Sequence, residues 1–251
     1  MEKLMNMPTQ APEGLDKEHI KAQTKKLRQR MFELQHQMYI QEKYSLLVIL
    51  QGVDTAGKDG TIRHVFSGVN PLGCRVKSFK KPTELEQKHD FLWRVFPHFP
   101  EAGKIQLFNR SYYEDIIMPQ LYWTHPHEII DHRYTMINTL EEHLQLNNTR
   151  VIKLLLHISS QEQWARIESR ISIPHKRWKY DPDDRKAAQR YEDLLEQYDQ
   201  LRLRCSDPVP WEVIPADQKW YRNFLVAKRL VDELEGLDIS LPEPDLPEEE
   251  A

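Results

Sequence analysis

The sequence predicts an α/β protein with a five-stranded parallel sheet between two layers of helices, a three-layer α/β/α sandwich. Short apolar runs, typical of strands buried on both faces, alternate along the chain with longer segments of helical periodicity. The first apolar run leads through a glycine-containing loop into a helix, which is the order found in phosphate-binding loops. Alternating strands and helices form parallel sheets that bind ligands at the carboxyl ends of the strands.

The composition narrows the class of protein. The chain has 251 residues, enough for one large domain or two small ones, and a net charge of only −4. This charge disfavours a protein that mainly binds nucleic acid. We expect no membrane span and no signal peptide, because no long apolar segment is present. Cys74 and Cys205 form no metal or redox spacing, and a reduced, cytoplasmic protein is expected.

The N-terminal region, residues 1–42, is predicted to be an arm followed by a helix. Residues 1–15 are expected to form a loose arm, and Asp16 can cap a helix that runs to about Glu42. One narrow apolar stripe on this helix favours packing on its own domain over a coiled coil, for which it is too short. The stripe consists of Ile20, Leu27, Met31, Leu34 and Met38.

The domain itself is predicted over residues 43–236. We expect strands at 46–50, 75–79, 105–109, 151–158 and 211–214. Helices are expected at 61–69, 84–96, 127–146, 160–171 and 184–204, with a last helix capped by Asp217. The segment 237–251 is acidic and rich in proline, and is predicted to be disordered.

The loop after the first strand fits the phosphate-binding pattern G-x-x-x-x-G-K at Gly52, Gly57 and Lys58. Its backbone N–H groups and the following helix N-terminus favour a bound anion, and Lys58, expected to be exposed, adds a full positive charge. The alternative is an ordinary turn between a strand and a helix. The predicted phosphate contacts of the loop are Thr55, Ala56, Gly57, Lys58, Asp59, Gly60 and Thr61.

Two carboxylates in this loop predict a metal ion. Asp59 stands where the usual loop has a serine or threonine that binds magnesium, and Asp54 lies within the loop. Carboxylates beside bound phosphate repel it unless a cation intervenes, which indicates Mg²⁺. The alternative for Asp59 is an acid that complements the dipole of the helix N-terminus.

The segment after the third strand carries further candidates. Asn109 occupies the position at which related loop enzymes place a magnesium-binding acid, and Glu114 or Asp115 can substitute for it. Arg110 can contact a transferred phosphate as a planar, permanent cation. A salt bridge at the sheet edge is the alternative role for Arg110.

Two clusters of basic residues are candidates for binding a long anion. Lys77, Lys80 and Lys81 follow the second strand, where the alternative is a solvated edge strand. The segment 166–190 is the densest cationic stretch, and its place after the fourth strand matches the lid of nucleotide kinases. Its alternatives are a surface for single-stranded nucleic acid and a solvated helical hairpin.

Five motifs, in order along the chain, together resemble family-2 polyphosphate kinases over roughly residues 43–234. They are the loop 52–60, Lys81-Pro82-Thr83, the segment 109–115, Trp178-Lys179 and the segment 211–217. The resemblance implies a phosphate-loop fold similar to thymidylate kinase, with a helical lid. It also implies reversible transfer of phosphate between inorganic polyphosphate and nucleotides, with Mg²⁺ as cofactor.

The resemblance also implies roles for particular residues. Asp54 looks like the metal-binding catalytic carboxylate, and Lys58 and Arg110 like the pair that stabilises the phosphate. Contacts to polyphosphate or nucleotide are implied for Lys81, Arg170 and Lys179. We assign Lys77 and Lys80 to polyphosphate, and Asn109, Arg110 and Glu114 to the nucleotide. Most of the family has Asp where this chain has Asn109. Asn at this position resembles the class III group, which phosphorylates AMP and ADP to ADP and ATP.

The expected partners are polyphosphate and AMP, ADP and ATP, with GMP and GDP as further candidates, and neither membranes nor nucleic acids. A homo-oligomer, dimer or tetramer, is expected. Two rival functions stay open from the sequence: an ATP-dependent nucleoside monophosphate kinase, and a non-enzymatic module that binds nucleic acid through the basic lid. Asp59 and the lysines at 77, 80 and 81 argue against the first, and the small net charge argues against the second.

Overall fold

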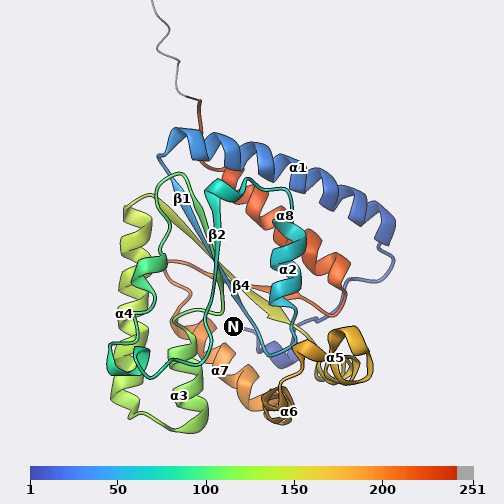
Figure 1. Cartoon of the computed structure of the whole chain (residues 1–251), viewed down its shortest axis with the longest axis vertical. Coiled ribbons are helices and arrows are strands. Elements are labelled where there is room, and N and C mark those ends of the chain that lie inside the picture. The colour runs from blue at the N-terminus through green and yellow to red at the C-terminus, as the bar shows by residue number, and fades with distance from the viewer. Residues whose placement is uncertain (242–251) are drawn as a thin grey trace, which may run out of the picture.

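A computed structural model describes residues 1–241, and it contains the predicted five-stranded parallel sheet (Figure 1). The strand order is β2-β3-β1-β4-β5, so β1 lies at the centre between β3 and β4. Every residue of β1 is buried, as expected for a strand covered on both faces. The strands are β1 (Ser45–Gln51), β2 (Cys74–Ser78), β3 (Ile105–Asn109), β4 (Thr149–His157) and β5 (Trp211–Pro215).

Helices cover both faces of the sheet, which confirms the predicted sandwich. Figure 1 shows α1, α2 and α8 on one side and α3, α4 and α7 on the other, while α5 and α6 stand together at one end. The helices are α1 (Lys17–Gln41), α2 (Lys58–Val65), α3 (Glu114–Tyr122), α4 (His127–Leu146), α5 (Ser160–Ser172), α6 (Pro182–Gln189), α7 (Tyr191–Arg204) and α8 (Lys219–Glu235). None of the helices in residues 1–241 is both long and apolar enough to cross a membrane.

Helix α1 behaves as predicted. The Asp16 carboxylate accepts hydrogen bonds from the backbone N–H groups of Glu18 and His19 and so caps the helix. Met31 and Met38 of its apolar stripe are fully buried in the core, and the helix packs against α8. The narrow stripe is therefore an intramolecular contact of the domain.

The N-terminal arm is packed onto the domain, so the prediction of a loose arm was wrong. Leu4 is fully buried, and its N–H donates to the carboxylate of Asp199 in α7. The hydroxyl of Thr9 donates to Asp217, which also accepts the backbone N–H of Ser159. Asp217 thus joins three segments and does not cap α8, whose N-cap is Gln218.

Two helices differ from the prediction for identifiable reasons. The segment expected as a helix at 84–96 contains only short 3₁₀ turns, because the Asp90 side chain accepts the N–H of Leu92 and turns the backbone locally. Helix α3 was missed because Pro119 lies inside it. Pro119 leaves the carbonyl of Asp115 without its helical donor, and the guanidinium of Arg133 donates to that carbonyl instead.

The remaining boundaries shift slightly. The helix expected at 184–204 is divided into α6 and α7 at Arg190, and α2 begins at Lys58 rather than Thr61. At the C-terminal end, Leu237 is buried in the core and Asp238 pairs with Lys43. The rest of the predicted disordered tail, residues 242–251, lies outside the described residues.

Candidate active site

The phosphate-binding loop between β1 and α2 is held in a shape that only glycine permits at two positions. Gly52 and Gly57 have φ angles of 142° and 102°, in the region that favours glycine. A Cβ atom on Gly52 would lie 2.5 Å from the carbonyl oxygen of Leu156. On Gly57 it would lie 2.1 Å from a guanidinium nitrogen of Arg222. The loop is therefore enclosed by β4 on one side and by α8 on the other.

Lys58 is buried, which corrects the expectation that it is exposed. Its side chain is 8% exposed, and Nζ donates to the carbonyls of Gly52, at 2.7 Å, and Val53, at 3.2 Å. Burial, aided by the nearby Arg110, lowers the pKa of Lys58 to about 8. Lys58 is thus a cation that already spans its own loop at the carboxyl end of β1.

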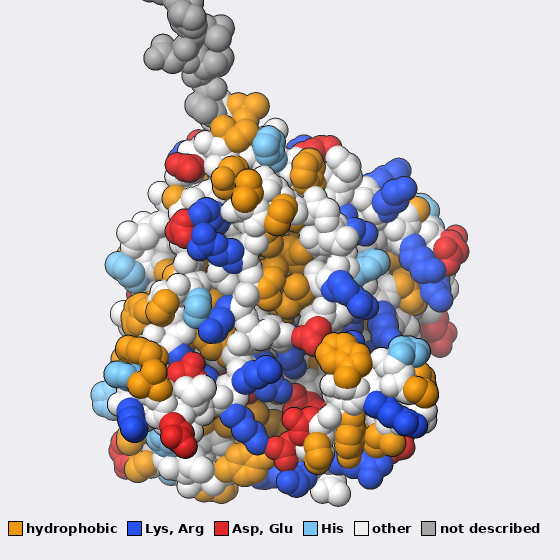
Figure 2. All heavy atoms as spheres, in the orientation of Figure 1, with side chains coloured by type: hydrophobic (Ala, Val, Ile, Leu, Met, Phe, Trp, Pro, Cys, Tyr) orange, Lys and Arg blue, Asp and Glu red, His pale blue; other side chains and the backbone are white. Residues whose placement is uncertain are grey.

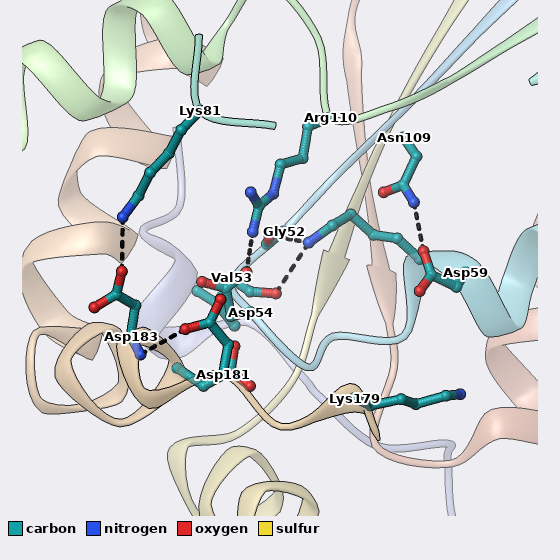
Figure 3. A network of polar contacts seen from close by, with 12 residues as sticks. Gly52, Val53, Asp54, Asp59, Lys81, Asn109, Arg110, Lys179, Asp181 and Asp183 are labelled. Carbon is teal, nitrogen blue, oxygen red and sulfur yellow. Dashed lines mark hydrogen bonds and ion pairs between the residues drawn. The ribbon is translucent and has the colours of Figure 1, made fainter. Parts of the chain in front are cut away.

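Arg110 and Asp54 form an ion pair at the centre of the site (Figure 3). Arg110 follows β3 with a φ of 61°, a left-handed conformation that non-glycine residues rarely adopt, and its N–H donates to Leu50 of β1. Burial alone would raise the pKa of Asp54, but Arg110 and Lys58 outweigh it and hold that pKa below its usual value. Asp54 is therefore a stable carboxylate between two cations.

The other acidic candidates have different surroundings. The amide of Asn109 donates to the carboxylate of Asp59, so these two predicted site residues pair with each other (Figure 3). Burial raises the pKa of Glu114, although Arg110 opposes the shift. Asp115 pairs with Arg94 at 2.6 Å and is thereby part of the support for α3.

A cavity of about 1570 Å³ runs along this loop and collects most of the predicted residues. From the prediction it is lined by Asp54, Thr55, Gly57, Lys58, Asp59, Gly60, Lys80, Lys81, Asn109, Arg110, Arg170 and Lys179. Four predicted residues do not line it: Ala56, Thr61, Lys77 and Glu114. The Ala56 carbonyl accepts from Arg166 and Arg222, the Thr61 hydroxyl bonds to the Gly57 carbonyl, and the Lys77 ammonium lies over the Phe79 ring.

The lid lies across the cavity in the form of a 3₁₀ segment, Pro174–Lys179, followed by α6. Two of the cations predicted to contact phosphate are paired with lid carboxylates. Lys81 bonds to Asp183 and Arg170 bonds to Asp184, each at 2.6 Å (Figure 3 shows the first). Lys179 lies over the ring of Trp178. The lid half of the cavity is therefore lined by both cations and acids.

Two arginines behind the loop support it. Arg166 of α5 donates to the carbonyls of Thr55 and Ala56, at 2.9 Å each, and to those of Ala216 and Asp217 beyond β5. From the sequence, Arg166 was identified only as one cation of the basic stretch 166–190. Nothing in the pattern indicated that it holds the phosphate-binding loop by hydrogen bonds to its carbonyls.

Arg222 of α8, which the sequence reasoning missed, is 2% exposed and lines the same cavity. It donates to the Ala56 carbonyl and to the side chain of Asn223, and within residues 1–241 it has no acidic partner. Burial, together with Arg166, lowers its pKa to about 10. The only sign in the sequence that Arg222 has a special role was its position on the apolar face of the last predicted helix.

A buried network lies directly beneath the turn that carries Arg110. The hydroxyls of Tyr112 and Tyr113 both donate to Oε1 of Glu141 in α4, at 2.7 and 2.8 Å. Lys153 of β4 donates to Oε2 of Glu141, to the Tyr113 hydroxyl and to the carbonyl of Cys205. Lys153 and Glu141 are 1% and 0% exposed. The turn after β3 is thus fixed from below by a buried ion pair in which Lys153 uses all three donors and Glu141 accepts three hydrogen bonds.

The fold and the site define a phosphate-loop phosphotransferase: a parallel sheet presents Lys58, Asp54 and Arg110 in one cavity, beneath a basic lid. Comparison with known proteins specifies it further. The sequence profile of the family Polyphosphate kinase 2 matches residues 14–242. The chain belongs to this family, and it is a polyphosphate-dependent nucleotide kinase.

Individual relatives agree with this assignment. An AMP/ADP-polyphosphate phosphotransferase of Meiothermus ruber is 42% identical over 222 residues, which are 87% of this chain and 82% of the relative. An ADP-polyphosphate phosphotransferase of Rhodopseudomonas palustris is 38% identical, over 90% of this chain and 83% of that protein. The crystal structure of polyphosphate kinase 2 from Arthrobacter aurescens TC1 superposes with a TM-score of 0.94 at 33% identity, covering 98% of this chain and 89% of that one.

The pairing of Asn109 with Asp59 can be tested by exchanging the two side chains. In Asn109→Asp, two carboxylates face each other without a donor between them. We expect the activation free energy to rise by about 1–2 kcal/mol, which lowers the rate roughly tenfold. The double variant Asn109→Asp/Asp59→Asn restores one donor and one acceptor and should recover most of the activity. The measurement is the rate against Mg²⁺ concentration, with Asp59→Asn alone as control. A single Asn109→Asp variant with full activity at low Mg²⁺ would show that an acid here binds metal instead.

The network beneath Arg110 predicts that replacing the buried carboxylate of Glu141 by an amide strongly destabilises the protein. Glu141→Gln leaves Lys153 buried without its counter-charge, which should lower the free energy of unfolding by about 3–5 kcal/mol. Glu142→Gln, at the exposed neighbouring position, is the matched control and should change stability by less than about 0.5 kcal/mol. Urea denaturation of both variants measures the difference. Equal stabilities would mean that Lys153 loses its proton at little cost.

Proposed function

We propose that this chain transfers phosphate from inorganic polyphosphate to AMP and to ADP, and back, at the cluster formed by Asp54, Lys58 and Arg110. The observation that carries the proposal is this cluster: two cations and one ionised carboxylate meet where the loop after β1 faces the turn after β3. The relative from Meiothermus ruber, named for both nucleotides, supports AMP and ADP as acceptors.

The reaction needs charge stabilisation more than a base. An oxygen of the nucleotide's terminal phosphate attacks the terminal phosphorus of the polyphosphate. A new P–O bond forms as the old anhydride bond breaks, and its electrons leave with the shortened chain. The attacking oxygen is already ionised, so no proton has to be removed. Lys58 and Arg110 stabilise the charge on the transferred group, and reversal exchanges the same two anhydrides.

Mg²⁺ fits the residues present. In phosphoryl-transfer sites this ion keeps several waters and is bound by one or two carboxylates together with substrate phosphates. Asp54 supplies one such carboxylate at the cavity wall, and residues 1–241 contain no cluster of three or more metal-binding side chains. We propose that Asp54 holds Mg²⁺ together with the phosphates, and that the ion neutralises their charge.

We assign the acceptor nucleotide to the lid half of the cavity. Lys80, Lys81, Arg170 and Lys179 line this half and can contact nucleotide phosphates. For Lys81 and Arg170 such contacts require release from Asp183 and Asp184. Two further predictions, a homo-oligomer, dimer or tetramer, and a location in the cytoplasm, stay predictions, and light scattering of the purified protein measures the first.

A matrix of donors and acceptors tests the proposed function. Polyphosphate or ATP is combined with AMP, ADP, GMP or GDP in the presence of Mg²⁺, and the products are separated by chromatography. We expect polyphosphate to yield ADP and ATP from AMP, and ATP from ADP. Transfer only when ATP is the donor would overturn the proposal.

The role of Lys58 gives a second test. Lys58→Met removes the cation but keeps much of the side-chain volume, and should lower kcat by about 10²–10³ or more. The melting temperature should fall only modestly, because the carbonyls of Gly52 and Val53 lose a donor but a buried charge is removed at the same time. A variant with wild-type kcat would remove Lys58 from the reaction.

A further inference from the structure

The cavity continues beyond the phosphate-binding loop, into a part that the sequence did not indicate. Past the N-terminus of α2 it is lined by side chains of α1, α2 and α8. Figure 2 shows Lys and Arg side chains gathered on this side of the molecule. The basic residues of this part are Lys21, Lys25 and Arg28 of α1, Arg63 and His64 of α2, and Lys219 and Arg222 of α8.

The two ends of the cavity differ in charge. Among the described residues, the carboxylates of the lining are Asp54 and Asp59, near the loop, and Asp181, Asp183 and Asp184 of the lid, and none comes from α1 or α8. At the lid end, Lys81 and Arg170 are paired with two of them. At the α1 end, among the described residues, Lys25, Arg28, Arg63, Lys219 and Arg222 form no salt bridge with an acid, whereas Lys21 pairs with the exposed Glu18, which does not line the cavity. Lys80, Lys176 and Lys179 at the lid end also form no salt bridge among the described residues, but the lining there includes three aspartates. Within residues 1–241, the excess of positive charge is therefore larger at the α1 end.

The excess of positive charge at the α1 end contributes to lower pKa values of two basic groups there. Burial lowers the pKa of His64, and Arg28, Arg222 and Arg63 lower it further. Burial likewise lowers the pKa of Lys219, with Arg166, Lys176 and Arg222 as additional causes. Cations that lower one another's pKa in this way favour the entry of an anion.

The geometry of α1 suits an extended anion. Lys21, Lys25 and Arg28 are spaced by four and three residues, so they lie on one face of the helix. At 1.5 Å per residue they extend over about 10 Å along its axis. A row of this length can contact several successive phosphates of a linear chain, whereas a single phosphate group in the phosphate-binding loop would be too short to reach it.

We propose that Lys21, Lys25 and Arg28, here called the α1 cation row, bind the part of a long polyphosphate chain that extends beyond the phosphate-binding loop. The row makes the enzyme prefer long chains over short ones. This inference rests on the proposed function. Polyphosphate is favoured over single-stranded nucleic acid because, within residues 1–241, Trp220 is the one Phe, Tyr or Trp side chain lining this end, and successive bases require several stacking surfaces.

The test compares two double variants of α1 that remove the same charge. Lys21→Ala/Lys25→Ala removes two cations of the row, whereas Lys17→Ala/Lys26→Ala removes two exposed lysines that do not line the cavity. KM and kcat are measured for long-chain polyphosphate and for short oligophosphates at several salt concentrations, with AMP as acceptor. Melting curves check that all proteins are folded.

We expect Lys21→Ala/Lys25→Ala to raise KM for long chains about 5- to 10-fold and for short ones less than about twofold, with kcat unchanged. The slope of log KM against log salt concentration for long chains should fall by about 1.4, or 0.7 for each lost contact. The control variant should match the wild type.

Three outcomes would overturn the inference. They are equal effects on long and short chains, no effect on either, or a control variant that loses affinity to the same extent. Single-stranded DNA that competes with long polyphosphate in the wild type, and more weakly in Lys21→Ala/Lys25→Ala, would assign the row to nucleic acid. If the wild type uses no polyphosphate of any length, the proposed function itself fails, and the two failures are thereby distinguished.

Discussion

The buried ion pair between Lys153 and Glu141 joins the parts of the molecule that must not move relative to one another. It connects the sheet to α4 and, through two tyrosine hydroxyls, to the turn that presents Arg110. Arg110 adopts a strained left-handed backbone conformation, which persists only where the surroundings over-determine it. Lys153 uses all three of its donors and Glu141 accepts three hydrogen bonds, so this buried ion pair also fixes the geometry of the candidate active site.

The sequence predicts the architecture well because its signals are local. Apolar runs identify the five strands, and the glycine spacing identifies the loop, since both depend on neighbouring residues. Helix α3 was missed because Pro119 normally excludes a helix, and only the distant Arg133 compensates for it. A tertiary contact of this kind leaves no trace in the local pattern.

The site was predicted less completely than the fold. Asp54, Lys58 and Arg110 carry motif positions and come together as expected. The burial of Lys58, the arginine at 222 and the cations of α1 depend on how distant helices pack around the loop. Charge counted along the sequence emphasised the lid, yet partner acids within residues 1–241 neutralise several lid cations, and further unpaired cations lie on α1, α2 and α8. Pairing is a property of the folded chain, so a count of basic residues cannot reveal it.

The packing of the N-terminal arm determines which changes the protein tolerates at that end of the chain. Its contacts reach α7 through Leu4 and the loop before α8 through Thr9, so it acts as a strap around the edge of the sheet. Met1 is 67% exposed, which leaves room for an added affinity tag ahead of it. Removing the first four residues would uncover the part of the core that Leu4 covers, and removing the first nine would also release Asp217 from Thr9. Extension and truncation at this terminus are therefore not equivalent, although both alter only the first residues of the chain.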